Sequence, residues 1–171
     1  MRAAVFAALL TFLLAACKSK EAPAPQPAAD APPLRSFVDM GDRQAAAQLL
    51  SGFHAIENNA WRWTERQFTV QLATPRPAPD GAVLALKLTV PPAVIQAVQT
   101  VTLSGSVQGA ELAPEKYDTA GAYTYQRDVA PNLLTSDSVR VTFRLDKFLT
   151  PGGGDLRELG IIVQGVGLTA K

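Results

Sequence analysis

Hydrophobic and polar residues alternate with a period of two along most of the chain that follows Trp61. Five segments share this alternation: 67–72, 84–90, 101–104, 123–126 and 139–146. Because successive side chains of a β-strand point to opposite faces, each segment would have one apolar and one polar face. A further segment, 159–168, is apolar on both faces at Ile161, Ile162 and Val163, which is typical of a buried central strand. The pattern predicts an all-β fold of two packed antiparallel sheets.

Turn-forming residues separate these segments. Asp80-Gly81 is typical of a tight turn. Pro91-Pro92 would end a strand, because proline cannot donate a ladder hydrogen bond. The glycine-rich segment 151–155 would form the most flexible loop, and we expect Arg157 or Glu158 beside it to anchor that loop.

One segment before the strands has the character of a helix. Asp39 or Asp42 could cap its first turn, strong helix formers follow, and Leu50 would lie in its last turn. Ser51-Gly52 would then end the helix, with Gly52 in a left-handed C-cap. The sequence therefore predicts one short N-terminal helix over 39–50.

The start of the chain resembles the signal peptide of bacterial lipoproteins. Arg2 is followed by an apolar run, and Leu14-Ala15-Ala16-Cys17 is similar to a lipobox. The resemblance implies cleavage before Cys17 and lipid modification of its sulfur, so that the protein is attached to a membrane. A plain signal peptide with an incidental cysteine and an uncleaved anchor are the alternatives. The apolar run is short for an anchor, since a spanning helix needs about 20 residues.

The predicted organisation has three parts. Residues 1–16 are the signal peptide, residues 17–33 are the lipidated cysteine with a proline- and alanine-rich tether, and residues 34–171 are the folded domain. An extended tether of this composition reaches on the order of 50 Å from the membrane. Lys18, rather than aspartate, follows the cysteine. By resemblance to the bacterial lipoprotein sorting rule, this implies the outer membrane, with the domain facing the periplasm or the surface.

The charges argue against several partners. The chain has 16 Lys and Arg against 15 Asp and Glu, and removal of Arg2 with the signal peptide leaves equal numbers. The charges are scattered, whereas nucleic-acid binding needs a basic surface that neutralises phosphates. No nucleic-acid partner is therefore expected. Cys17 is the only cysteine, so packing and hydrogen bonds would have to hold the fold without a disulfide.

Three stretches resemble bacterial jelly-roll domains of the carbohydrate-binding, galactose-binding-like type. They are Leu50-Ser51-Gly52-Phe53-His54-Ala55-Ile56-Glu57, Trp61-Arg62-Trp63-Thr64 and the closing segment 155–163. The resemblance extends from Val38 to Leu168 and implies a jelly-roll β-sandwich of about eight strands. The family usually has an aliphatic residue where this chain has Gly165 and Gly167. We therefore expect an irregular final strand.

Residues for catalysis are scarce. The chain has one histidine, His54, and it lacks Gly-x-Ser-x-Gly, HExxH and P-loop motifs. His54 and Glu57 alone do not make a zinc site, which needs three or four ligands. We expect no enzyme activity, no metal and no cofactor.

Five residues are candidates for a site. Trp61 and Trp63, two apart on a predicted strand, would face the same side. They could stack on a sugar together with His54, although burial of both in the core is the favoured interpretation. A third alternative places Trp61 at the rim and Trp63 inside. His54 could equally be a hydrogen-bonded cap. Glu57 and Arg62 are expected to pair across the turn at 58–59, as a structural contact more than a ligand contact.

Two functions from different classes remain open. The first is a non-catalytic envelope lipoprotein that acts as an interaction or assembly module and holds a protein partner at a distance from the membrane. The second is a glycan-binding module associated with cell-surface polysaccharide, which would use the face around His54, Trp61 and Trp63.

Overall fold

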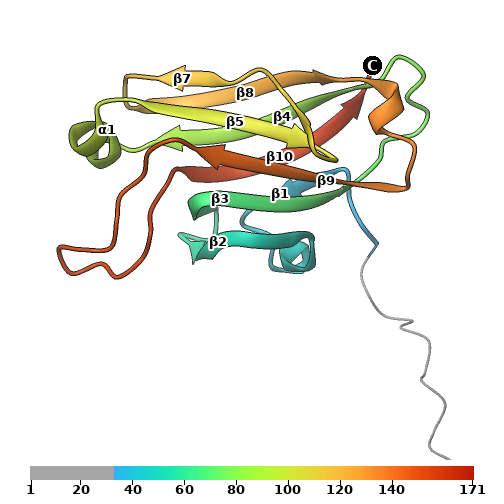
Figure 1. Ribbon diagram of the computed structural model, residues 1–171. Helices are drawn as coiled ribbons and strands as arrows, with labels where there is room; N and C mark the ends of the chain where they lie inside the picture. Colours follow the sequence, from blue (N-terminus) through green and yellow to red (C-terminus); the bar gives the residue numbers. More distant parts are fainter. Residues whose placement is uncertain (1–32) are drawn as a thin grey trace, which may run out of the picture. The chain divides into compact units, whose positions relative to one another are not determined.

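The computed structural model describes residues 33–171, which form an all-β jelly-roll sandwich (Figure 1). Cys17 and nearly all of the predicted tether lie outside the described residues. The described part contains ten strands: β1 (Phe37–Asp39), β2 (Leu49–Glu57), β3 (Trp61–Ala73), β4 (Ala82–Val90), β5 (Val101–Val107), β6 (Ala110–Glu111), β7 (Glu115–Tyr117), β8 (Gly121–Val129), β9 (Ser138–Leu145) and β10 (Ile162–Ala170). The strands exceed the predicted eight because β1, β6 and β7 have only two or three residues each.

All strand pairs are antiparallel, and the main order is β6-β5-β9-β3-β10-β4-β8. The long strand β3 belongs to both layers of the sandwich. Its first residues, at Arg62 and Trp63, pair with β10, whereas its second half, from Gln67 to Ala73, pairs with β9. One layer therefore contains β5, β9, β3 and β2, and the other contains β10, β4, β8 and β1. The fold class predicted from the sequence is confirmed.

Aromatic residues join the two layers in the core. Tyr125 on β8 meets the ring of Phe143 on β9 edge-to-face, with centroids 6.1 Å apart. Phe143 in turn stacks on Phe68 of β3 at 5.1 Å. All three side chains are fully buried, and they lie on the apolar faces that the period-two pattern predicts. Burial of such large rings is a major source of stability in a fold that has no disulfide to hold it.

The predicted helix over 39–50 is wrong in extent and type. A short 3-10 helix, η1 (Arg43–Gln48), occupies the middle of the segment, and Asp42 caps it by accepting from the backbone N of Gln44. Leu49 and Leu50 already belong to β2. Gly52 does adopt a positive φ of 75°, but inside the strand, where a Cβ would collide with the carbonyl oxygen of Gln67. Pairing with β3 therefore overrides local helix propensity here.

The helix that the structure does contain was not predicted. Pro91 and Pro92 end β4 as expected, but Pro92 also starts α1 (Pro92–Val98). Proline suits the first position of a helix, because its missing N–H would be unsatisfied there anyway. Val94 fixes this short helix to the core.

The final strand β10 lies centrally, between β3 and β4, as predicted. Ile161 and Val163 are fully buried, but Ile162 is only half-buried because it points to the opposite face. The expected irregularity is a register shift between Val163 and Gly165, which leaves Gln164 bulged.

The two glycines of β10 seat an aromatic ring. Phe37 of β1 is paired with Gly167, and its ring lies over both glycines while 47% of the residue remains exposed. A Cβ at Gly165 would lie 2.8 Å from Phe37 Cζ, and a Cβ at Gly167 would lie 2.7 Å from Phe37 Cδ2. Aliphatic residues at these positions are therefore incompatible with this placement of Phe37.

We expect Gly167→Ala to destabilise the protein by about 1–3 kcal/mol, because the new methyl group must displace Phe37 or the backbone of Ser36. Urea unfolding followed by tryptophan fluorescence measures the effect. Gly152→Ala is the matched control, since the nearest atom to its Cβ would be Thr150 O at 3.9 Å. Equal stability of the two variants would contradict the seating of Phe37 on β10.

Candidate functional site

Polar side chains cover the outer face of the layer that contains β5, β9 and β3. Strand register aligns them in rows, because directly opposed residues share a face. One row is Ser104, Arg144 and Gln67, and the next is Ser106, Thr142 and Thr69. Arg144 Nη2 donates to Gln67 Oε1 at 3.1 Å, and the hydroxyls of Thr69 and Thr142 lie 3.2 Å apart. Hydroxyl, amide and guanidinium groups thus form a ladder across three strands.

Three hollows lie side by side on this face, and neighbouring hollows share residues. The first, of about 310 Å³, is lined by Ser104, Gly105, Ser106, Glu111, Thr142 and Arg144. The central hollow, of about 400 Å³, is lined by Arg66, Gln67, Arg144, Leu145, Asp146 and Phe148. The third, of about 380 Å³, is lined by Ser51, Glu65, Arg66, Gln67 and Glu158. We call the three together the polar groove.

The charged groups around the central hollow differ in their partners. The backbone N of Arg66 donates to Glu158 Oε1 at 2.6 Å, and the Arg66 guanidinium lies 3.9 Å from the same oxygen and 5.6 Å from the centre of the Phe148 ring. Asp146 Oδ1 already accepts from the backbone N of Thr102 at 2.6 Å. Arg144, by contrast, bonds the neutral amide of Gln67, and among the described residues it forms no ion pair with a carboxylate.

The two tryptophans lie together but do not form a flat surface. The rings of Trp61 and Trp63 are 6.4 Å apart and nearly perpendicular, at 76°. Both are half-buried, and Trp63 packs against the core. Trp63 is opposite Ile162, on the β10 side of β3. Trp63 therefore has a core role, Trp61 is not among the residues packed against the core, and a sugar site at these rings stays a prediction.

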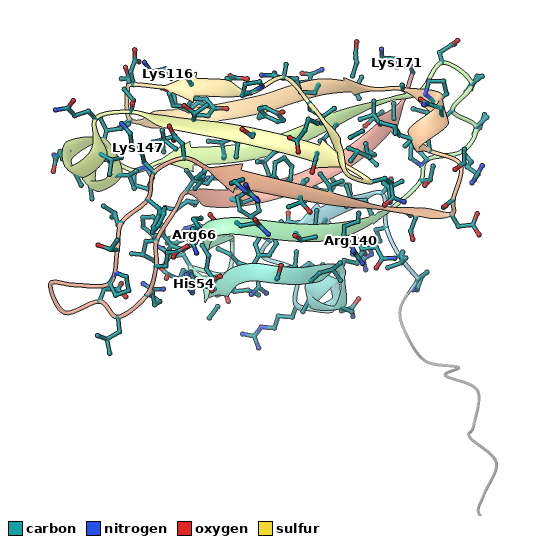
Figure 2. The ribbon with its side chains drawn as sticks, in the orientation of Figure 1. His54, Arg66, Lys116, Arg140, Lys147 and Lys171 are labelled. Atoms are coloured by element: carbon teal, nitrogen blue, oxygen red, sulfur yellow. The ribbon has the colours of Figure 1, made fainter. Side chains whose placement is uncertain are left out.

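His54 has a structural contact. Its Nε2 lies 2.7 Å from the carbonyl oxygen of Glu158, on the connection between β9 and β10. Its own carbonyl oxygen accepts from Arg62 Nη1 at 2.9 Å. No hydrogen bond in residues 33–171 joins His54 to either indole, so the structure fixes His54 to a loop instead of to the tryptophan pair. Glu158 also accepts from the backbone N of Arg66, so His54 and Arg66, both labelled in Figure 2, contact the same residue of this loop.

The expected pair of Glu57 and Arg62 does not form. Register places Glu57 opposite Trp61 and Ile56 opposite Arg62. The two side chains therefore point to opposite faces of the β2–β3 pair. Arg62 donates to the carbonyl oxygens of Met40 and His54, while Glu57 accepts from Arg157 Nη1 at 2.8 Å.

Arg157 anchors the glycine-rich connection, as expected. It donates from Nε and Nη2 to the carboxylate of Asp155, at 3.0 and 2.9 Å, and from Nη1 to Glu57. The connection also forms isolated bridges between Leu149 and Leu159 and between Gly152 and Asp155. In Figure 1 it extends past the strand ends on the same side of the molecule as α1. Its far end supplies Glu158 to the third hollow.

Within residues 33–171 no group of three histidine, cysteine or acidic side chains could hold a metal ion. No helix in this range is long and apolar enough to cross a membrane.

Comparison with known proteins identifies the fold and no family. No protein-family model and no curated protein matches the chain. A family GH115 4-O-methyl-α-glucuronidase with specificity for decorated arabinogalactans is similar in structure, with a TM-score of 0.50 and 13% identity over 86% of this chain. This chain covers only 19% of that enzyme.

Carbohydrate-binding modules are also among the structural neighbours. A CBM4 module matches with a TM-score of 0.40 and 8% identity, over 79% of this chain and 85% of that one. The xylan-binding module CBM15 matches with a TM-score of 0.35 and 14% identity, over 78% of this chain and 94% of that one. At these identities the likeness concerns the β-sandwich fold.

The clamp between Arg157 and Asp155 should depend on pH. Hydrogen bonds from Arg157 lower the pKa of Asp155 from 3.8 to about 2. A carboxyl whose pKa is lower in the folded state stabilises that state above its unfolded pKa, and this contribution is lost as the pH falls through the folded pKa. The loop should therefore loosen between about pH 4 and pH 2. The carboxyl carbon of Asp155, followed by NMR, should titrate near 2, and a midpoint near 3.8 would contradict the clamp.

Proposed function

We propose that this protein is a non-catalytic glycan-binding module that uses the polar groove and is anchored to the bacterial cell envelope through Cys17. The single observation that carries the glycan-binding proposal is the series of three adjoining hollows across β5, β9 and β3, which are lined by both donors and acceptors. Each sugar hydroxyl both donates and accepts. The amides and hydroxyls of the groove do the same, whereas its arginines donate and its carboxylates accept.

The size and shape of the groove suit a chain better than a single small molecule. Each hollow has about 310 to 400 Å³, within the roughly 300–1,000 Å³ common for ligand sites. Three such hollows in a line, with shared walls at Arg144 and at Arg66 and Gln67, match successive units of an oligosaccharide. The ladder hydrogen bonds order these side chains before binding, which reduces the entropy lost on association.

Gln67→Ala should weaken glycan binding about three- to tenfold, because a neutral hydrogen bond contributes about 0.5–1.5 kcal/mol. A glycan array identifies the ligand with the detergent-purified protein, and titration calorimetry then gives the affinities. Gln126→Ala is the matched control, since Gln126 is exposed on β8 of the other layer.

The same measurements separate the groove from the tryptophan pair and from a protein partner. Loss of binding in Trp61→Ala, with Gln67→Ala unchanged and both folded, would place the glycan at the tryptophans. If no glycan on the array binds and crosslinking captures a protein partner, the interaction module is favoured instead.

The anchoring part of the proposal rests on the sequence Leu14-Ala15-Ala16-Cys17. Cys17→Ala should leave unprocessed precursor and abolish the incorporation of a fatty-acid analogue, because the thiol that accepts the lipid is gone. Metabolic labelling followed by gel fluorescence measures both. Unlabelled wild-type protein would remove the lipid anchor from the proposal, and recovery in the inner-membrane fraction would contradict the outer-membrane location.

A further inference from the structure

The central hollow differs from its two neighbours in charge. Arg66 and Arg144 both line it, and Asp146 is its only acidic residue. The first hollow instead contains Glu111 with Arg144, and the third contains Glu65 and Glu158 with Arg66. Local positive charge is therefore concentrated in the middle of the groove, on a protein whose acidic and basic residues are nearly equal in number.

From this arrangement we infer that the central hollow binds the carboxylate of a hexuronate residue, and that the flanking hollows bind neutral sugars. The inference rests on the proposed function. Arg144 has the required chemistry, because its guanidinium bonds only the neutral Gln67 among the described residues and keeps donors for a ligand. A planar guanidinium binds a carboxylate through two parallel hydrogen bonds.

The other groups of the hollow fit this assignment. The Phe148 ring lies on one side of the Arg66 guanidinium, and Arg66 Nε also lies 3.9 Å from Glu158 Oε1, a loose ion pair that leaves most of the Arg66 side chain exposed. The carboxylate of Asp146 is oriented toward the backbone N of Thr102. Lys147 is bonded elsewhere, to the carbonyl oxygen of Val98 and the hydroxyl of Thr100. The anion would therefore meet Arg144, which has no ion pair among the described residues, together with Arg66, which is shared with Glu158, and the single carboxylate of Asp146.

The carboxylates in the two flanking hollows determine how closely spaced the negative charges of the glycan can be. A glycan with a negative charge on every residue would bring charges next to Glu111 in the first hollow and Glu158 in the third, and like charges repel at such distances. The groove thus favours a chain in which a hexuronate is flanked by neutral sugars, over a homopolymer of hexuronates.

The test is binding of matched glycan pairs to the detergent-purified protein. A glycan array carries each acidic glycan beside its carboxyl-reduced form. The acidic members are hyaluronan oligosaccharides, polygalacturonate and glucuronoxylan fragments, and a xylan without hexuronate is the neutral member. We expect acidic members with spaced hexuronates to bind at least tenfold better than their reduced forms and than polygalacturonate. Binding should weaken as salt rises from 50 to 500 mM, because screening reduces the attraction between charges.

Arg144→Gln should remove most of the preference for the acidic member of a pair, so that the ratio of the affinities for the acidic and the reduced member approaches one. Arg140→Gln is the matched control, because Arg140 lies on the same strand and face, four residues from Arg144 and outside the hollow. Figure 2 shows Arg140 and Arg66 at opposite ends of the β3–β9 pair.

The outcomes separate the inference from the proposed function. Equal binding of acidic and reduced members by the wild-type protein would overturn the hexuronate site and leave a neutral glycan groove. An unchanged acidic preference in Arg144→Gln would overturn the assignment of the carboxylate to Arg144 in the central hollow. If heparin binds and millimolar sulfate displaces it, the group bound in the central hollow is a sulfate ester and not a hexuronate carboxylate, which would overturn the inference. Absence of any binding on the array would overturn both.

Discussion

The sandwich depends on the hydrogen bonds at Thr64, where β3 passes from one layer to the other. Thr64 is fully buried, and its N–H donates to Ile161 O at 2.9 Å while its carbonyl oxygen accepts from Gly160 N at 2.7 Å. Its hydroxyl lies 3.2 Å from both the carbonyl oxygen and the N of Ile161. A single buried residue therefore satisfies the backbone groups that the change of partner would otherwise leave unpaired, and such groups are costly when buried. The close approach of the chains at this point also requires a glycine at position 160, because a Cβ there would lie 2.5 Å from Leu145 Cδ1.

This crossing also positions the groove. The residues just before Thr64 pair with β10, and pairing with β9 begins at Gln67, which is therefore the first residue of β3 to stand opposite Arg144. Glu158 lies two residues before Gly160 and bonds the backbone of Arg66, which ties the glycine-rich connection to the same point. The backbone of Arg66 is thereby held by the loop, while Arg144 is positioned by its strand and by its hydrogen bond to Gln67. A site built on such a frame needs little rearrangement to bind a ligand.

Much of the fold could be predicted from the sequence, because alternation records which residues face the core. β3, β4, β5, β8 and β9 contain the five alternating segments except Asp146. The errors occurred where tertiary contacts override local preference. The run from Gln44 to Gln48 favours a helix, but buried Gln48 donates to the carbonyl oxygens of Arg35 and Gln71 and draws the chain into β2 after a short 3-10 helix. The chain also has no local signal for Phe37 on β10, since the two are far apart in sequence.

The candidate site was harder to predict for a physical reason. Sequence reasoning singled out aromatic and rare residues, yet Trp63 packs against the core and His54 is fixed to Glu158. The groove consists instead of residues such as Gln67, Thr142 and Arg144, which in an alternating pattern look like any solvated strand face. Only strand register, through β5–β9 and β3–β9 pairing, shows that these side chains stand in rows across three strands. A binding surface of this type is a property of the order of strands in the sheet, which comes from pairing between distant segments and not from a local motif.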